Sequence, residues 1–171
     1  VRALDCDWQM FFLTGQNAGR GAAYNAHCLI DQTSRHLLAV DITAKEKICF
    51  VEGMPCDPAL CKYASGYFDK IASALDHAAQ VMHCDRETIE AIALYHEVCP
   101  FELSLDMALR ADLLVGDYNY IFDPVVRLKR FMNHPDMHLL TDEAHQLLPR
   151  AQDMLTVKLS RKSVRKAKSI S

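Results

Sequence analysis

Short apolar runs punctuate the chain and end at turn or polar residues, which is the pattern of buried strands. Met10–Leu13, for example, is followed directly by Thr14 and Gly15. None of the runs is long enough to span a bilayer. The predicted strands are Met10–Leu13, His36–Ile42, Leu113–Val115 and His138–Leu140.

Helices are predicted between these strands. Asp57 and Pro58 indicate a helix start, because Asp caps well and Pro suits the first helical position, and the apolar spacing continues to Met82. Asp85 is a second candidate N-cap, for a helix that ends near Glu97. The other helical stretches are Asn17–Ile30, Ser104–Arg110 and a C-terminal tail that ends in the basic segment Arg161–Lys168.

Strands that alternate with helices predict an α/β fold built on a parallel sheet. One stretch differs, because between Cys49 and Cys61 the cysteines stand among Gly53, Pro55 and Pro58 with little periodicity. We therefore expect an insertion in the α/β layer there.

The composition is that of an ordinary globular protein, with 171 residues, half of them apolar and a quarter charged. A net charge of −3 excludes a global basic field, so any contact with nucleic acid must be local. No signal peptide is visible, and seven cysteines without one favour metal ligands or buried thiols over disulfides. Because the first residue is Val, we expect the chain to begin partway through a gene product.

An acidic motif, Asp142-Glu143-Ala144-His145, follows the last predicted strand. In α/β domains that hydrolyse nucleotides, an Asp at the carboxyl end of a strand helps to hold Mg²⁺, and a neighbouring Glu polarises the attacking water. His145 would couple that site to bound nucleic acid. The alternative is an acidic helix start, with Asp142 as the N-cap.

The usual partner of such a motif is missing from this sequence. A phosphate-binding loop requires G-x-x-x-x-G-K-[ST], whereas the glycine-rich stretch Gly15–Gly21 holds Arg20 and no such lysine. Either the chain is not an ATPase or the loop lies upstream of Val1.

Four cysteines form the second motif. Cys49, Cys56 and Cys61 are separated by six and four residues, and Cys99 follows later with Pro100 behind it. Four thiolates from one segment can bind a [4Fe–4S] cluster or zinc. The tight C-x2-C pairs of zinc sites are missing, which favours iron–sulfur. The alternative is that these are small buried residues.

The other cysteines fit burial better than metal binding. Cys6 precedes the first predicted strand and Cys28 lies on the helix after it, while Cys84, at an interhelical turn, is the reserve ligand. The only histidine with a predicted role is His145. The remaining histidines have no paired spacing of the zinc-protease kind and are expected at or near the surface.

Taken together, the two motifs resemble the XPD/DinG-type helicases of superfamily two, in which a four-cysteine insertion precedes D-E-A-H. The matching segments resemble the bacterial DinG-like branch and occur in its order from Phe12 to about Ser160. They are Lys47–Phe50, Cys61–Asp69, Val98–Glu102, Ala111–Pro124 and Asp142–Leu147.

The resemblance implies a partial RecA-like parallel-sheet motor domain with an inserted helical iron–sulfur domain. The motor domain would comprise residues 1–45 and 102–171, with the insertion at 46–101. A structural [4Fe–4S] cluster would be held by Cys49, Cys56, Cys61 and Cys99. Mg-ATP would be bound and hydrolysed at Asp142, Glu143 and His145, with Asp142 as the Mg²⁺ ligand.

The same resemblance implies a cytoplasmic bacterial protein that unwinds DNA from 5′ to 3′ with ATP, in DNA repair, at single strands and fork junctions. The DNA contacts would be Thr14, in a segment like motif Ia, and Tyr118 and Tyr120. For the tyrosines, stacking on bases competes with packing in the core. For Arg127, Lys129 and Arg130, contact with phosphates competes with a solvated face.

The chain alone is expected to be inactive, because the phosphate-binding loop and the second motor domain of the parent protein are absent. Two other hypotheses about the function stay open. One is a non-enzymatic metal- and DNA-binding module, a degraded helicase. The other is a small electron-transfer protein, against which the acidic motif argues.

Overall fold

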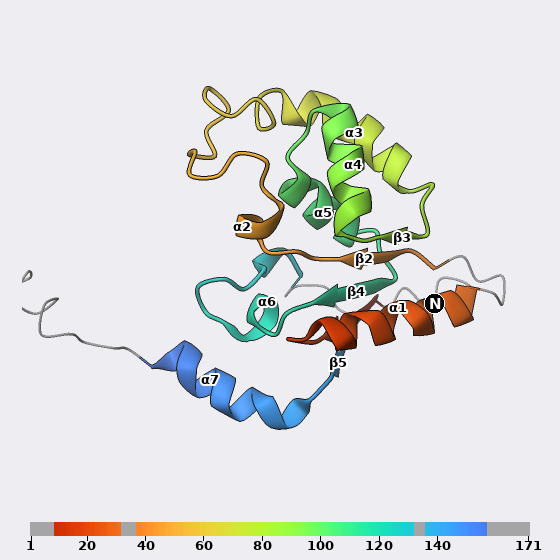
Figure 1. Ribbon diagram of the computed structural model, residues 1–171, viewed down its shortest axis with the longest axis vertical. Coiled ribbons are helices and arrows are strands. Elements are labelled where there is room, and N and C mark those ends of the chain that lie inside the picture. The colour runs from red at the N-terminus through yellow and green to blue at the C-terminus, as the bar shows by residue number, and fades with distance from the viewer. Residues whose placement is uncertain (1–8, 32–36, 132–135, 157–171) are drawn as a thin grey trace, which may run out of the picture.

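A sheet of five parallel strands forms the centre of the computed structural model, which describes residues 9–31, 37–131 and 136–156 (Figure 1). The strands are β1 (Gln9–Leu13), β2 (Ala39–Asp41), β3 (His83–Cys84), β4 (Leu113–Gly116) and β5 (Met137–Thr141). They lie in the order β3-β2-β4-β1-β5, and every pair is parallel. The α/β fold with a parallel sheet, typical of a partial RecA-like motor domain, is therefore confirmed.

Strand β1 lies between β4 and β5, and its alternate residues, which point to one face of the sheet, are the buried ones. Phe11 pairs in register with Leu114 of β4 and Leu139 of β5, and both Phe11 and Leu13 are fully buried. Since all the strands point the same way, their carboxyl ends meet at one edge of the sheet. In open α/β sheets this edge is where ligands bind.

Seven helices surround the sheet in the described part of the chain. They are α1 (Asn17–Asp31), α2 (Lys45–Ile48), α3 (Tyr67–Ala78), α4 (Arg86–His96), α5 (Pro100–Ala108), α6 (Asn119–Phe122) and α7 (Leu147–Leu155), with 3-10 turns η2 (Lys129–Phe131) and η3 (Ala144–Gln146). Helices α3, α4 and α5 gather on the side of β2 and β3, whereas α7 lies beyond β5 (Figure 1). None of these helices has the length and apolar character needed to cross a membrane.

The predicted helix from Asp57 to Met82 is wrong in its first half. Asp57 caps only a single turn. Its side chain accepts a hydrogen bond from the Ala59 amide, and its backbone carbonyl accepts one from the Cys61 amide. Gly66 then takes a left-handed conformation (φ 62°), and α3 begins after it. A left-handed residue interrupts a right-handed helix, so the apolar spacing across it does not lie on one helix.

Two helix starts depend on local chemistry. Asp85 caps α4 as predicted, and its side chain accepts from the Thr88 amide at 2.8 Å. The helix predicted at Ser104–Arg110 begins earlier, at Pro100, because Cys99 is extended and Pro100 suits the first helical position.

The segment 46–101 shares its core with the rest of the molecule. Strand β3 comes from this segment and pairs with β2, with Ala39 opposite His83 and Val40 opposite Cys84. Buried residues of α3, α4 and α5 belong to the same apolar cluster as those of β1 and β4. The division at residues 45 and 101 stays a prediction about the parent protein. Cys6, His134 and the basic segment Arg161–Lys168 lie outside the described residues.

Candidate functional site

The acidic motif lies at the carboxyl end of β5, at the ligand-binding edge of the sheet. The Asp142 amide donates to the Leu13 carbonyl of β1 at 2.9 Å, which continues the pairing of the two strands by one residue. The Asp142 carboxylate does not cap a helix. It accepts a hydrogen bond from the Thr14 hydroxyl, with 3.2 Å between Thr14 Oγ1 and Asp142 Oδ2. The side chain is thus turned towards β1.

Glu143 has a backbone conformation that non-glycine residues rarely adopt, with φ 48° and ψ 44°. Such conformations cost free energy and cluster at functional sites. The carboxylate is exposed and lies 3.3 Å from Nε2 of His145, which is also exposed. Glu143 and His145 therefore face solvent, where a ligand can reach them.

Helix α1 passes close to the pair formed by Thr14 and Asp142. A Cβ atom on Gly19 would overlap the Thr14 hydroxyl and would lie 2.6 Å from Asp142 Oδ2. Only glycine permits this approach of α1 to the end of β5. The sequence shows Gly19 as one glycine of a glycine-rich stretch, without this contact.

Tyr118 packs beneath the acidic motif and is almost fully buried. Its hydroxyl donates to the Asp142 carbonyl, and the Arg150 guanidinium lies 4.9 Å from its ring centre. Burial raises the pKa of Tyr118, with the Asp142 charge adding to the effect. Tyr120 is also buried. Both rings are thus packed in the core of this chain, and their contact with DNA stays a prediction.

The four cysteines of the second motif line one cavity of about 320 Å³, called here the cysteine cavity. Cys61 is buried, Cys49 and Cys99 are partly buried, and Cys56 is exposed. The same cavity is lined by five aromatic side chains, Phe50, Tyr63, Tyr67, Phe68 and Phe101. Cys84 lies elsewhere, in β3, with its thiol 3.6 Å from the Ala78 carbonyl.

Amide groups and one ammonium group lie next to the sulfur atoms of the cysteine cavity. The Val51 amide donates to Cys49 Sγ at 3.5 Å. Burial raises the pKa of Cys99, and the amides of Glu102 and Phe101, which donate to its sulfur, oppose that shift. The pKa of Lys45 is raised because its ammonium group donates to the Cys56 sulfur and lies near Cys49 and Cys99.

The four cysteines share a cavity without forming a site for a single ion. Within the described ranges, no three His, Cys, Asp or Glu side chains are close enough to hold one metal ion. A [4Fe–4S] cluster binds each cysteine at a different iron, and for these four cysteines it stays a prediction.

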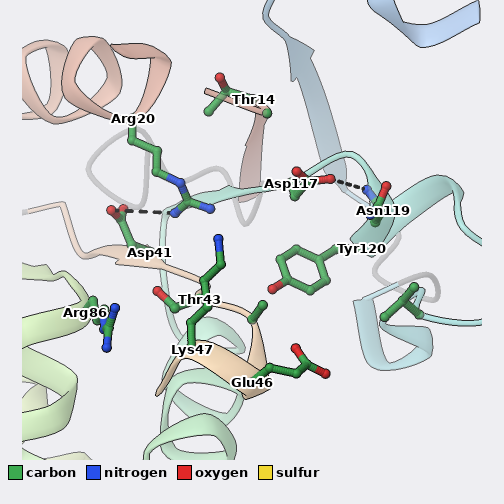
Figure 2. Close-up of a pocket in the computed structure, with 13 residues that line it drawn as sticks. Thr14, Arg20, Asp41, Thr43, Glu46, Lys47, Arg86, Asp117, Asn119 and Tyr120 are labelled. Atoms are coloured by element: carbon green, nitrogen blue, oxygen red, sulfur yellow. Dashed lines mark hydrogen bonds and ion pairs between the residues drawn. The ribbon is translucent and has the colours of Figure 1, made fainter. Parts of the chain in front are cut away.

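A second cavity, called here the strand-end pocket, opens beyond the carboxyl ends of β1, β2 and β4 and measures about 620 Å³. Arg20, Asp41, Lys47, Asp117 and Tyr120 are among the side chains that line it (Figure 2). Thr14 lines the pocket as well and also contacts Asp142, so the pocket adjoins the acidic motif.

Comparison with known proteins identifies the family. The model of the DEAD_2 family matches residues 18–164. The chain belongs to the DEAD_2 family. This agrees with the resemblance to superfamily-two helicases, while the bacterial branch stays a prediction.

Two relatives of this DEAD_2 chain carry the name regulator of telomere elongation helicase 1 homolog. The protein from Caenorhabditis briggsae is 26% identical over 114 residues, which are 64% of this chain and 12% of that protein. The protein from Anopheles gambiae is 26% identical over 83 residues, which are 47% of this chain and 8% of that protein. The chain thus spans a small part of the relatives it matches.

Sequence reasoning missed several polar residues of the DEAD_2 chain that tertiary structure brings together. Arg20 and Lys47, from two different helices, both line the strand-end pocket (Figure 2). His77 of α3 and His96 of α4 lie 3.2 Å apart between Nδ1 and Nε2. Neither pair has a sequence spacing that indicates contact, so only the fold could reveal them.

Proposed function

We propose that this chain is the middle part of the first motor domain of an ATP-dependent DNA helicase that carries a structural [4Fe–4S] cluster. Cys49, Cys56, Cys61 and Cys99 would hold the cluster. The parent protein would couple ATP hydrolysis to 5′–3′ DNA unwinding, with the acidic motif at its Mg-ATP site.

The observation that carries this proposal is the common cavity of the four cysteines. Cys49 and Cys99 are far apart in sequence, yet they line one space together with Cys56 and Cys61. Buried unrelated thiols would not be expected to converge in this way. A bound cluster would supply four covalent links between α2, the loop before α3 and the start of α5. The amides and the Lys45 ammonium would stabilise the ligands' negative charge.

The nucleotide part of the proposal rests on where the acidic motif lies. Asp142 stands at the carboxyl end of a parallel strand, and the Thr14 hydroxyl holds its carboxylate towards β1. In this position the carboxylate would bind Mg²⁺, while the exposed Glu143 would orient the attacking water. His145, 3.3 Å from Glu143, would link the site to bound DNA.

Further parts of the parent protein would complete the motor. Strand β5 is the last strand of the described sheet on its side, and Leu139 and Leu140 on it are about half exposed. Exposed leucines on an edge strand are unfavourable in water, so a neighbouring segment of the motor would cover them. That segment would include the phosphate-binding loop.

The first test is the metal content of the chain purified without oxygen. We expect about four iron and four sulfide per chain, lost in Cys99→Ser and kept in Cys28→Ser. Cys28 is the matched control because it is partly buried, on α1, and outside the cysteine cavity. Zinc in place of iron, or no metal at all, would exclude the cluster.

The second test uses the parent protein. Glu143→Gln should abolish DNA-stimulated ATP hydrolysis while DNA binding remains, because the substitution removes the group that orients water. If the parent hydrolyses no ATP although iron is present, the non-enzymatic metal- and DNA-binding module takes the place of the helicase.

A further inference from the structure

Two histidine side chains meet where helices α3 and α4 pack against each other. The two helices lie side by side (Figure 1). Ala74 of α3 and Ala93 of α4 are fully buried and belong to the same apolar cluster. His77 and His96 each stand three residues further along, on the same side of their helices. Since His77 is exposed and His96 is partly buried, the pair lies at the rim of the helix contact.

The spacing of the two imidazoles is that of ligands to one metal ion. Nδ1 of His77 and Nε2 of His96 are 3.2 Å apart. Zinc binds imidazole nitrogen at about 2.0–2.1 Å, so two such ligands of one tetrahedral ion lie about 3.3–3.4 Å apart. The ring centres are 5.4 Å apart and the rings are inclined by 65°. Their edges meet rather than their faces, so both nitrogen lone pairs can be directed at one ion.

The two nitrogens have no competing charged partner. Within residues 9–31, 37–131 and 136–156, neither imidazole forms an ion pair, and their polar contact is with each other. Burial lowers the pKa of His96, and the charge of His77 lowers it further. At neutral pH His96 is therefore uncharged and has a lone pair to offer, which is the form of histidine that binds metals.

The surroundings hold the rings in place and favour a positive charge. Tyr95 packs edge-on against both, with its ring centre 4.9 Å from that of His96 and 5.8 Å from that of His77. A ring that is already restricted loses less conformational entropy when it binds a ligand. Both histidines also stand in the last turn of their helices, where the unpaired carbonyl groups stabilise cations.

We propose that His77 and His96 bind one divalent transition-metal ion, of the zinc or nickel class, across helices α3 and α4. Imidazole nitrogen suits these ions, whereas Mg²⁺ and Ca²⁺ prefer oxygen. The described part of the chain has no group of three ligands around one ion, so the protein supplies two and water fills the other positions. The ion is therefore exchangeable. This site goes beyond the proposed function and does not depend on it.

A bound ion would join two segments that lead to the cysteine cavity. Helix α3 follows Cys61 in the chain, and α4 ends three residues before Cys99. Neither His77 nor His96 lines that cavity, so the histidine site is a separate one. Helices α3 and α4 could not part without breaking a bond to the ion. Amide hydrogen exchange that requires their separation should therefore slow when the ion is bound.

Titration of Ni²⁺ into the 171-residue chain, purified without oxygen and followed by calorimetry, tests the proposal. His77→Ala and His96→Ala should each weaken Ni²⁺ binding by at least about tenfold, since loss of even a supporting group at a metal site costs that much. Ni²⁺ should also slow hydrogen exchange in α3 and α4 of the native chain and not of these variants. His138→Ala is the matched control, because His138 is exposed on β5, at the other end of the sheet from β3.

The cysteines are the other possible nickel ligands, so Cys99→Ser is titrated alongside. Binding that is kept in Cys99→Ser and His138→Ala and lost in the two histidine variants supports the site. Native affinity in His77→Ala, loss in Cys99→Ser alone, an equal loss in His138→Ala, or no binding to the native chain would each overturn it. Thermal unfolding without metal checks that every variant folds, and His77→Gln serves if His77→Ala does not. Iron content is measured separately, so each result leaves the helicase proposal as it stands.

Discussion

The Thr14 hydroxyl donates a hydrogen bond to the Asp142 carboxylate, with 3.2 Å between the oxygens, and so joins the carboxyl ends of β1 and β5. Its hydroxyl also lies 3.3 Å from the Gln16 carbonyl, but a carboxylate is the stronger acceptor. Thr14 itself is buried and lines the strand-end pocket. One side chain therefore contacts the proposed Mg²⁺ ligand and also lines the strand-end pocket.

Replacing Thr14 with valine tests this link. Thr14→Val keeps the shape and removes the hydroxyl, so we expect the free energy of unfolding to fall by about 1 kcal/mol. Thr14→Ser, which keeps the hydroxyl, should lose less. Urea denaturation followed by circular dichroism measures both variants. Equal stability of Thr14→Val and the native chain would mean that the hydrogen bond contributes nothing.

Two glycines of α1 offer a matched pair of substitutions. Gly19→Ala should destabilise the chain by about 1–3 kcal/mol, because the new methyl group would overlap Thr14 and approach Asp142. Gly21 has no atoms within 4 Å of its would-be Cβ, so Gly21→Ala should stabilise the helix by up to about 1 kcal/mol. Thermal unfolding compares them. A harmless Gly19→Ala would contradict the close approach of α1.

The elements with strong local signals could be predicted from the sequence. Some signals depend only on neighbouring residues, and the elements they predict are present in the structure. They are the apolar runs of β1, β4 and β5 and the Asp85 cap of α4. Strand β3 has two residues and no apolar alternation of its own, since it exists through pairing with β2. The start of α3 depends on the left-handed Gly66, which apolar spacing does not report.

Some residues of the candidate site could likewise be predicted from the sequence, and others could not. Four cysteines and the acidic motif are recognisable because their chemistry is carried by residue type and order. The contact of Thr14 with Asp142 and the common pocket of Arg20 and Lys47 depend on how β1, β5, α1 and α2 pack. Pairs that are distant in sequence leave no periodic signal, so a single sequence could not reveal them.

Cys84 should make stability depend on pH in the alkaline range. Burial raises the pKa of its thiol to about 11 from an ordinary value of 9.0. Between about pH 9 and pH 11 the unfolded chain loses this proton while the folded chain keeps it, so stability falls as pH rises. The full loss is roughly 2–3 kcal/mol. Below pH 9 the contribution is fully present.

Urea denaturation at pH 8, 9 and 10 measures this loss, with Cys84→Ala as the comparison. Tyrosines also titrate at alkaline pH, but they do so equally in both proteins. The difference in stability between the native chain and Cys84→Ala should therefore shrink as pH rises. A constant difference would show that the thiol titrates alike in both states.

Phe68 should contribute to DNA binding without contributing to the fold. Its side chain is 89% exposed, at the start of α3, and it borders the cysteine cavity. The neighbouring Tyr67 is anchored, with its hydroxyl donating to Asp106 at 2.8 Å, so Phe68 is displayed on a fixed turn of helix. An exposed ring in that setting suits stacking on a base, which is worth about 1–3 kcal/mol.

Phe68→Ala should therefore weaken binding of a single-stranded oligonucleotide roughly tenfold or more, measured by fluorescence anisotropy. Thermal stability and iron content should stay the same, because the ring is hardly buried. Tyr95→Ala is the matched control, since Tyr95 is a 77% exposed ring on α4, outside both cavities. If Tyr95→Ala weakens binding as much as Phe68→Ala, the effect is a general one of surface aromatics, and Phe68 has no special place on the DNA path.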